Sequence, residues 1–193
     1  YEVVGAYSTF ANKGIYIEPI FITRIEDKNG VPIFEVIPKT SDVLSEEAAY
    51  VTLNLMEGVT NYGSGGRLRH SGLEKTNYIY KNLITGYPYA FENAIAGKTG
   101  TTQNQSEGWF MGMVPNLVTG VWVGGEDRSV HFEDIAFGQG ATMALPIWAQ
   151  FMKNAYSNPD LGISAEEFQS PKVLTIPTDF ENWHTYHNPL EVK

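Results

Sequence analysis

Two apolar runs on either side of a Pro-Asn dipeptide constrain the fold of this chain most. Residues 109–114 read Trp-Phe-Met-Gly-Met-Val, Pro-Asn follows at 115–116, and residues 117–123 read Leu-Val-Thr-Gly-Val-Trp-Val. Aromatic and β-branched residues favour strands, and two such runs around a two-residue turn favour antiparallel pairing. The sequence therefore predicts a hairpin in which Trp109 and Trp122 pack across facing strands.

The periodicity of the other apolar residues completes an α+β fold, an antiparallel sheet covered by helices. Glycine, proline and turn residues separate the elements. The strands are expected near 95–102, 108–114 and 118–124, the helices near 2–12, 45–60 and 141–156, and a peripheral hairpin at about 15–37.

Two of these helices have an expected core-facing stripe. The second should begin near Ser45, whose hydroxyl can cap it, and should bury Val51, Leu55 and Val59. The stripe of the last helix consists of Met143, Ile147, Phe151 and Ala155.

Two stretches lack this periodicity. Residues 67–92 predict a long ordered loop within the domain. Residues 157–193 are Pro-rich, polar and acidic, which predicts a loosely held C-terminal extension beyond a domain that ends near residue 156.

Composition excludes several classes of function. The chain has 13 Lys and Arg against 22 Asp and Glu, a net charge of −9, and no basic cluster, which argues against nucleic-acid binding. The lack of cysteine excludes disulfides, thiolate catalysis and Cys-based zinc sites. Apolar stretches are broken well before about 18 residues, so no membrane span is expected. His184 and His187 alone are too few ligands for zinc, and no metal or cofactor is predicted.

The triplet Gly97-Lys98-Thr99 resembles the end of a phosphate-binding loop. Such a loop also needs a glycine five positions before its second glycine, so that backbone N–H groups can surround the phosphates. That position is Glu92, which would repel phosphate. A nucleotide site is therefore not expected.

The same residues can instead form a strand at the rim of a cleft. Alternation sends Lys98, Gly100 and Thr102 one way and Thr99 and Thr101 the other. A lysine and hydroxyls on a strand edge can hold a carboxylate, while backbone N–H groups bind an extended peptide or an oxyanion. From spacing alone, a Thr-rich strand with one solvated lysine remains the favoured interpretation, because three residues are a short motif.

Three motifs carry a resemblance to a known family. Residues 96–102 (Ala-Gly-Lys-Thr-Gly-Thr-Thr), 108–115 (Gly-Trp-Phe-Met-Gly-Met-Val-Pro) and 121–125 (Val-Trp-Val-Gly-Gly) resemble the end of the transpeptidase domain of class A penicillin-binding proteins. Lys-Thr-Gly is a signature of this serine acyltransferase family. Residues 4–14, 56–59 with 63–67, and 144–148 resemble further segments of that domain. The resemblance thus covers about residues 3–153 and implies an incomplete penicillin-binding/β-lactamase-like serine transpeptidase fold.

The resemblance implies a role for each residue of the motif. Lys98 would favour the bound carboxylate electrostatically, and Thr99 and Thr101 would hydrogen-bond the carboxylate of a D-Ala-D-Ala peptide or a β-lactam. The Thr101 backbone N–H would form half of an oxyanion hole. Gly100 would let the substrate approach the backbone, and Thr102 would extend the peptide contact.

The chain departs from the family pattern in one respect. The family acylates a serine three residues before a lysine, and a Ser-x-Asn motif completes its proton network. Here Ser64 is followed at the third position by Arg67, no serine has a lysine there, and no Ser-x-Asn occurs. With its start at Tyr1, the chain is expected to be a piece of a longer protein whose residues 1–156 form the second half of a catalytic domain.

These features together predict part of a peptidoglycan D,D-transpeptidase that cross-links stem peptides through an acyl-serine intermediate. The resemblance implies a parent that also acts as a glycosyltransferase. It implies a membrane anchor in the N-terminal remainder and a place at the extracytoplasmic (periplasmic) face of the bacterial inner membrane. The fragment alone is expected to be inactive and able to self-associate through surface that its missing partners would cover. A non-catalytic wall-binding or interaction module is the alternative, and a β-lactamase-like hydrolase is a third, less favoured one.

Overall fold

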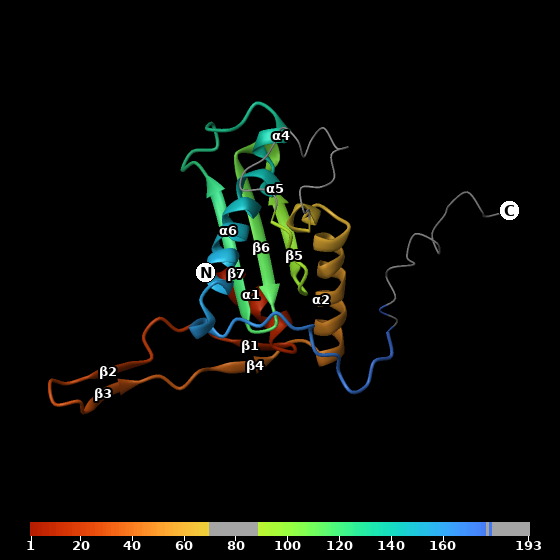
Figure 1. Ribbon diagram of the computed structural model, residues 1–193. Helices are drawn as coiled ribbons and strands as arrows, with labels where there is room; N and C mark the ends of the chain where they lie inside the picture. The colour runs from red at the N-terminus through yellow and green to blue at the C-terminus, as the bar shows by residue number, and fades with distance from the viewer. Residues whose placement is uncertain (70–88, 177, 179–193) are drawn as a thin grey trace.

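A three-stranded antiparallel sheet in the order β5-β6-β7 lies at the centre of the structure (Figure 1). Its strands pair without a register break, and the turn between β6 and β7 has two residues. The computed structural model describes residues 1–69, 89–176 and 178. The strands are β5 (Ala96–Thr101), β6 (Glu107–Val114) and β7 (Leu117–Gly124).

This sheet confirms the predicted hairpin. Trp109 lies directly opposite Trp122, and the centroids of the two indole rings are 6.5 Å apart. The fold class is also as predicted, since helices cover an antiparallel sheet (Figure 1). The helices are α1 (Glu2–Ala11), α2 (Glu46–Asn61), α4 (Ile135–Gly138), α5 (Gly140–Met143) and α6 (Leu145–Tyr156), with short turns η1 (Gly66–Leu68), η2 (Gln103–Gln105) and η3 (Pro159–Leu161).

The helix α6 packs on one face of the sheet around a single tryptophan. Trp148 is buried, its ring lies 5.2 Å from that of Phe110 in an edge contact, and a Cβ at Gly112 would overlap its indole. Glycine at this position lets a large side chain lie directly on the strand backbone. Burial of a side chain of this size stabilises the fold by about 3 kcal/mol.

The opposite face of the sheet is covered by α1 and α2. Val4 of α1 lies over Gly120 of β7, and Leu53 and Met56 of α2 pack with Met113 of β6. The helix α2 also lies beside β5 (Figure 1). On β5 itself, α2 packs from this side and α5 contacts the strand from the other.

The predicted core stripes of two helices are wrong, although the helices are present. Ser45 caps α2 as predicted, by accepting from the backbone N–H of Ala48 at 3.1 Å, but Leu55 is 52% exposed. Both helices carry apolar residues on more than one side, so the sequence pattern alone did not select the buried one. The side of α2 that is buried consists of Ala49, Leu53, Met56 and Thr60.

The last predicted helix is divided in two. The chain turns at Ala144 between α5 and α6, and Pro146 lies in the first turn of α6, where a missing N–H costs no helical bond. Ile147 and Phe151 of the predicted stripe are about half exposed, whereas Ala155 is buried. The buried residues of α6 are Leu145, Pro146, Trp148, Ala149, Met152 and Ala155.

The peripheral hairpin is longer than predicted and forms an arm that projects from the body (Figure 1). The outer strands β2 and β3 pair around the Asp27–Gly30 turn, as expected. The first strand, β1, pairs instead with β4, which the sequence analysis did not anticipate. The bounds are β1 (Ile15–Ile17), β2 (Arg24–Glu26), β3 (Pro32–Glu35) and β4 (Thr40–Asp42).

The segment after α6 docks on the body as far as residue 176. Phe168 is buried against α2 and β6, and the Asn116 side chain bonds Gly162 and Ser164. The Glu47 carboxylate of α2 accepts hydrogen bonds from the backbone and hydroxyl of Thr175. Polar contacts at two places and one buried aromatic ring therefore fix this part of the segment.

Two expectations from the sequence, the long loop and the absence of a membrane span, can be compared only with the described residues. Of the long loop expected over 67–92, residues 70–88 lie outside the described part. Within the described residues, no helix combines the length and the apolar character needed to cross a membrane.

Candidate functional site

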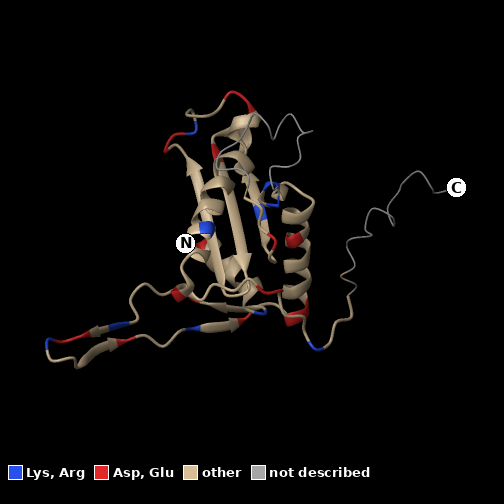
Figure 2. Cartoon of the chain, in the orientation of Figure 1, with Lys and Arg blue, Asp and Glu red and all other residues tan. Residues whose placement is uncertain are grey.

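The Lys-Thr-Gly strand is β5, an edge strand of the sheet. Lys98 is exposed, and its ammonium group donates to the carbonyl oxygen of Thr99 at 2.7 Å. Within the described residues no carboxylate forms an ion pair with it. Figure 2 shows basic residues on β5 and on the segment after α2, next to each other. The edge therefore presents positive charge on a chain that is acidic as a whole.

Thr99 and Thr101 point to the other side of β5, as strand alternation predicts. The hydroxyl of Thr99 lies 2.6 Å from the hydroxyl of Ser64, in the turn that follows α2. The hydroxyl of Thr101 accepts a hydrogen bond of 3.0 Å from the backbone N–H of Gly140, the first residue of α5. Both threonine hydroxyls are thus held by neighbouring elements.

The backbone of β5 offers donors along its open edge. In an antiparallel pair, successive residues point their N–H and C=O groups alternately toward and away from the partner strand. The N–H of Thr102 bonds the carbonyl of Glu107 across the β5–β6 turn. The N–H groups of Thr101 and Thr99 therefore point away from β6, where a ligand can reach them.

Gly100 and Thr102 are placed differently from the two threonines. A Cβ at Gly100 would lie 3.1 Å from the Cβ of Trp109, so glycine here accommodates the facing tryptophan. The Thr102 hydroxyl lies 3.0 Å from that of Ser106 and accepts from the Glu107 N–H at 2.9 Å. These bonds hold Thr102 in the turn, and they do not favour its predicted substrate contact.

The turn that follows β5 has an unusual backbone. Asn104 and Gln105 both adopt positive φ angles, of 61° and 52°, which non-glycine residues rarely do. Two consecutive residues of this kind cost of order 1–3 kcal/mol each, and such strain clusters at functional sites. The turn is fixed at the end of β5 that carries the two threonines.

At the other end of β5, a cluster of hydrogen bonds centred on Thr60 connects the strand to α2. Thr60 donates to the carbonyl of Ile95 at 2.5 Å, and Arg69 donates to Thr60 and to the carbonyls of Phe91 and Asn93. Arg69 thus joins α2 to the segment that leads into the strand. Its partly buried guanidinium has a pKa below the usual range, chiefly because burial disfavours the charge.

Glu57 lies on the same helix and has a strongly shifted acidity. Burial, followed by repulsion from Glu167, raises the pKa of Glu57 to about 7, while Arg69 acts in the opposite direction. The Glu57 carboxyl therefore changes charge near neutral pH, and its charged neighbours are Glu167 and Arg69.

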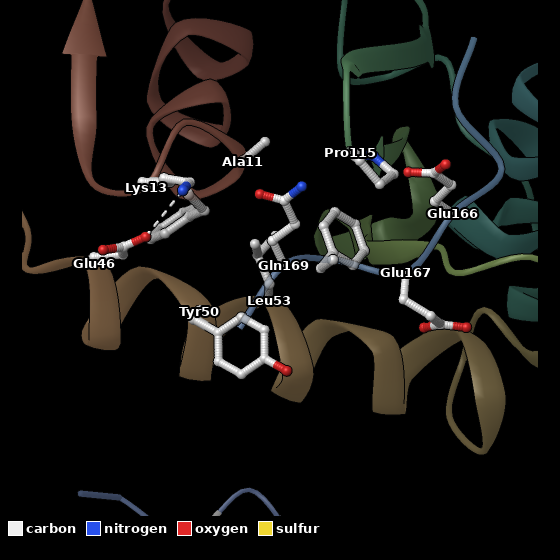
Figure 3. Close-up of a pocket in the computed structure, with 11 residues that line it drawn as sticks. Ala11, Lys13, Glu46, Tyr50, Leu53, Pro115, Glu166, Glu167 and Gln169 are labelled. Atoms are coloured by element: carbon white, nitrogen blue, oxygen red, sulfur yellow. Dashed lines mark ion pairs between the residues drawn. The ribbon is translucent and has the colours of Figure 1, made fainter. Parts of the chain in front are cut away.

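A separate cavity of about 200 Å³ lies at the opposite end of the sheet, beside the β6–β7 turn (Figure 3). One wall carries an ion pair of 3.1 Å between Lys13 and Glu46, and another carries Tyr50 and Phe168. None of the predicted site residues lines it. The candidate site is therefore the open edge of β5.

The chemistry of this edge suits an anion. A carboxylate only accepts hydrogen bonds, and the edge offers the ammonium of Lys98, two hydroxyls and outward-facing N–H groups. Groups of three or more metal-ligating side chains are absent from the part of the chain that the structure describes. His184 and His187 lie outside the described residues.

Sequence reasoning missed Ser64 and Gly140. The glycine-rich segment at 63–66 could contact a ligand, but such a segment is more often a flexible turn, and the family resemblance gave Ser64 no role. Both residues reach β5 from more than 30 positions away along the chain. No local pattern indicates such a contact.

Comparison with known proteins gives one family. The penicillin-binding protein transpeptidase domain matches residues 1–153. Penicillin-binding protein 1A of Aquifex aeolicus (strain VF5) is 30% identical over 181 residues, which cover 91% of this chain and 22% of that protein. Penicillin-binding protein 2D of Bacillus subtilis (strain 168) is 32% identical over 174 residues, with 90% and 22% covered. The chain therefore spans 22% of the length of these curated relatives.

Solved structures give the same fold. Penicillin-binding protein 1A from Haemophilus influenzae matches with a TM-score of 0.61 and 25% identity, covering 88% of this chain and 27% of that one. Penicillin-binding protein A from M. tuberculosis, in an imipenem acyl-enzyme complex, matches with a TM-score of 0.54 and 20% identity, covering 79% and 30%. The second likeness supports the fold alone.

Proposed function

Because the chain belongs to the penicillin-binding protein transpeptidase family, we propose that it is part of a peptidoglycan D,D-transpeptidase and supplies the strand that binds the donor peptide. Residues 1–156 are then the C-terminal half of the transpeptidase domain, and residues 157–193 are an extension. The observation that carries this proposal is the open edge of β5, where one ammonium group and two threonine hydroxyls lie near outward-facing backbone N–H groups.

The ligand of this edge is a peptide that ends in D-Ala-D-Ala. Its terminal carboxylate accepts hydrogen bonds from Thr99 and Thr101 and is attracted by the charge of Lys98. Its backbone lies along β5 as an added strand. The carboxylate of a β-lactam uses the same donors, because it presents the same charge and acceptors.

The reaction proceeds through an ester. A serine oxygen attacks the carbonyl carbon of the penultimate D-Ala, and the Thr101 N–H stabilises the oxyanion. The peptide C–N bond then breaks, and D-Ala leaves as the amine with the proton it receives. The amine of a second stem peptide attacks the ester, forms the cross-link and returns the serine hydroxyl.

The 193 residues do not contain the motifs for the first of these steps. They include no Ser-x-x-Lys and no Ser-x-Asn, so the catalytic serine comes from other polypeptide of the same protein. The chain alone is therefore inactive. The complete protein is a class A enzyme that also carries a glycosyltransferase, is anchored in the membrane and acts at the extracytoplasmic face.

The β7 edge supports the proposed self-association of the isolated chain. Within the described residues β7 pairs with β6 alone, so its outer edge has unpaired backbone groups along eight residues. Apolar side chains nearby, among them Trp122 at 46% exposure, add to its tendency to pair. An edge of this length favours pairing with another strand.

The test of the proposed ligand is a titration followed by NMR of the chain labelled with ¹⁵N. The ligands are an N-acylated peptide that ends in D-Ala-D-Ala and the same peptide with a C-terminal amide. We expect the acid to bind more tightly than the amide by a factor of about 30, because hydrogen bonds to a charged group contribute about 2 kcal/mol. Equal affinity for the two peptides would contradict the proposal.

A second measurement separates the enzyme from a non-catalytic wall-binding module, which would be favoured if the rest of the protein also lacked a Ser-x-x-Lys and a Ser-x-Asn. A fluorescent penicillin is added to the isolated chain and to the complete protein that carries it. We expect a covalent band from the complete protein only. A band on the isolated chain would contradict the absent nucleophile, and no band from either would favour the module.

A further inference from the structure

The two threonine hydroxyls of β5 share a feature that the proposed function does not explain. Behind Thr101 lies the backbone N–H of Gly140, at 3.0 Å from its hydroxyl oxygen. Behind Thr99 lies the Ser64 hydroxyl, at 2.6 Å. Each hydroxyl is thus in contact with a group that is able to donate to it.

A donor behind a hydroxyl determines what that hydroxyl can do. A threonine hydroxyl has one proton to donate and lone pairs to accept with. A backbone N–H can only donate, so Gly140 occupies an acceptor site of Thr101 and leaves its proton for another partner. Accepting a hydrogen bond also polarises the hydroxyl and makes it a better donor. The Thr101 hydroxyl can therefore donate its proton in a hydrogen bond to an anion.

We infer that Ser64 is a positioning residue: its hydroxyl donates a hydrogen bond to the Thr99 hydroxyl, as the Gly140 N–H donates to the Thr101 hydroxyl. In the complex, Ser64 donates to Thr99, and Thr99 donates its own proton to the ligand carboxylate. Ser64 thereby increases the preference for a carboxylate over a neutral carboxamide. This inference rests on the proposed function, because it concerns the same ligand.

The turn that carries Ser64 is built to hold it in place. Backbone N–H groups of Gly63 and Gly65 bond the carbonyls of Gly58 and Val59 in the last turns of α2, at 3.0 and 2.9 Å. A Cβ at Gly63 would lie 3.0 Å from the Val59 backbone, so this close return of the chain favours glycine. Ser64 itself remains exposed.

The same turn is tied to the element that holds Thr101. Arg67 donates to the carbonyl of Ala141 at 3.1 Å and to the hydroxyl of Thr142 at 2.8 Å, both in α5. Since α5 begins with Gly140, one guanidinium links the supports of the two threonines. The turn after α2 and the start of α5 are therefore connected to each other, and both contact β5 near its end.

The test uses the acid and amide peptides with five variants of the chain. These are Ser64→Ala, Ser64→Thr, Thr99→Val, the double variant of Ser64→Ala with Thr99→Val, and Ser41→Ala as a control in the exposed strand β4. We expect Ser64→Ala to weaken binding of the acid about tenfold and leave the amide within about twofold. Ser64→Thr, which keeps a hydroxyl, and the control should both bind like the wild type.

The double variant tests whether Ser64 acts through Thr99. Because the coupling partner is already gone, adding Ser64→Ala to Thr99→Val should change acid affinity by less than about twofold. A full tenfold loss in that background would overturn the inference, since Ser64 would then act on the ligand by itself. An equal loss for acid and amide would also overturn it, because a purely structural role predicts that result.

The two proposals fail in distinguishable ways. If the wild-type chain prefers the acid and Ser64→Ala keeps the same preference, the inference about Ser64 is wrong and the proposed function stands. If the wild-type chain does not distinguish acid from amide, both are wrong. Amide spectra of each variant show whether it keeps the fold.

Discussion

The two edges of the central sheet differ in what they present to a partner. The β5 edge carries Lys98 and two threonine hydroxyls, one in contact with the Ser64 hydroxyl of the turn after α2 and one accepting from the Gly140 N–H of α5. The β7 edge carries mostly apolar and glycine residues, and from Thr119 to Gly124 its residues alternate between partly buried and exposed. Both edges have unpaired backbone groups, but only β5 adds charge and oriented hydroxyls to them.

The difference teaches how one sheet can serve binding at one side and assembly at the other. Backbone hydrogen bonds can form with any added strand, so the selectivity of a sheet edge comes from side chains that bind one kind of ligand more tightly. At β5 these side chains favour a carboxylate. At β7 the apolar side chains favour another packed element, which agrees with a chain that spans 22% of the length of its relatives.

The largest expected effect is a loss of stability from a substitution at the contact between α5 and β5. A Cβ at Gly140 would overlap the carbonyl oxygens of Gly100 and Trp109, so Gly140→Ala should lower the free energy of unfolding by about 3 kcal/mol. Gly58→Ala is the matched control, because nothing lies within 4 Å of its Cβ position in α2. It should stabilise the chain by about 0.5–1 kcal/mol. Urea unfolding measures both, and equal effects would contradict the close contact of α5 with β5.

The next prediction applies one substitution to both edges. Thr101→Val removes a carboxylate donor and should weaken acid-peptide binding by about 2 kcal/mol. Thr119→Val in β7 removes a buried hydroxyl that finds no hydrogen-bond partner among the described residues, and should stabilise the fold by about 1 kcal/mol without changing affinity. Peptide titration and urea unfolding of the two variants check this. A loss of affinity in Thr119→Val would remove the distinction between the edges.

A pH dependence should be confined to the β5 side of the sheet, because Glu57 lies on α2, the helix that contacts β5. Burial and Glu167 raise its pKa from about 4.5 to about 7. A raised pKa means that stability is full below about pH 4.5 and is lost as the pH rises through 7. Since the group is partly solvated, Glu57→Gln should stabilise the chain at pH 8 by about 1–2 kcal/mol and have little effect at pH 4. Stabilisation of the same size at both pH values would contradict this assignment.

The smallest effect on stability is expected at the β7 edge. Trp122→Lys should cost less than about 1 kcal/mol, because the side chain is 46% exposed and loses mainly its contact with Trp109. A lysine on an edge strand opposes pairing with another strand. Sedimentation should therefore show less self-association than in the wild type. An unchanged association constant would contradict the proposal that the chains associate through the β7 edge.

The sequence predicted those parts of the fold that local chemistry determines. The β6–β7 hairpin follows from two apolar runs and a two-residue turn, and the start of α2 follows from the hydroxyl of Ser45. The buried sides of α2 and α6 were predicted wrongly. Leu55 and Phe151 are as apolar as the residues that are buried, so only the position of the sheet decides between the sides.

The candidate site was predictable only where it lies within one strand. The family resemblance named Lys98, Thr99 and Thr101 as candidates, and strand alternation predicted which way their side chains point, but neither indicated the residues that support them. Ser64 and Gly140 approach β5 from 35 and 39 positions away. Such contacts depend on how α2 and α5 pack on the sheet, which no spacing in the sequence records.

The most direct test of the account is a crystal structure of the chain with the N-acylated D-Ala-D-Ala peptide bound. We expect the peptide to lie along the open edge of β5, with its terminal carboxylate within hydrogen-bond distance of the Thr99 and Thr101 hydroxyls. A peptide paired with β7, or seated in the cavity beside the β6–β7 turn, would contradict it.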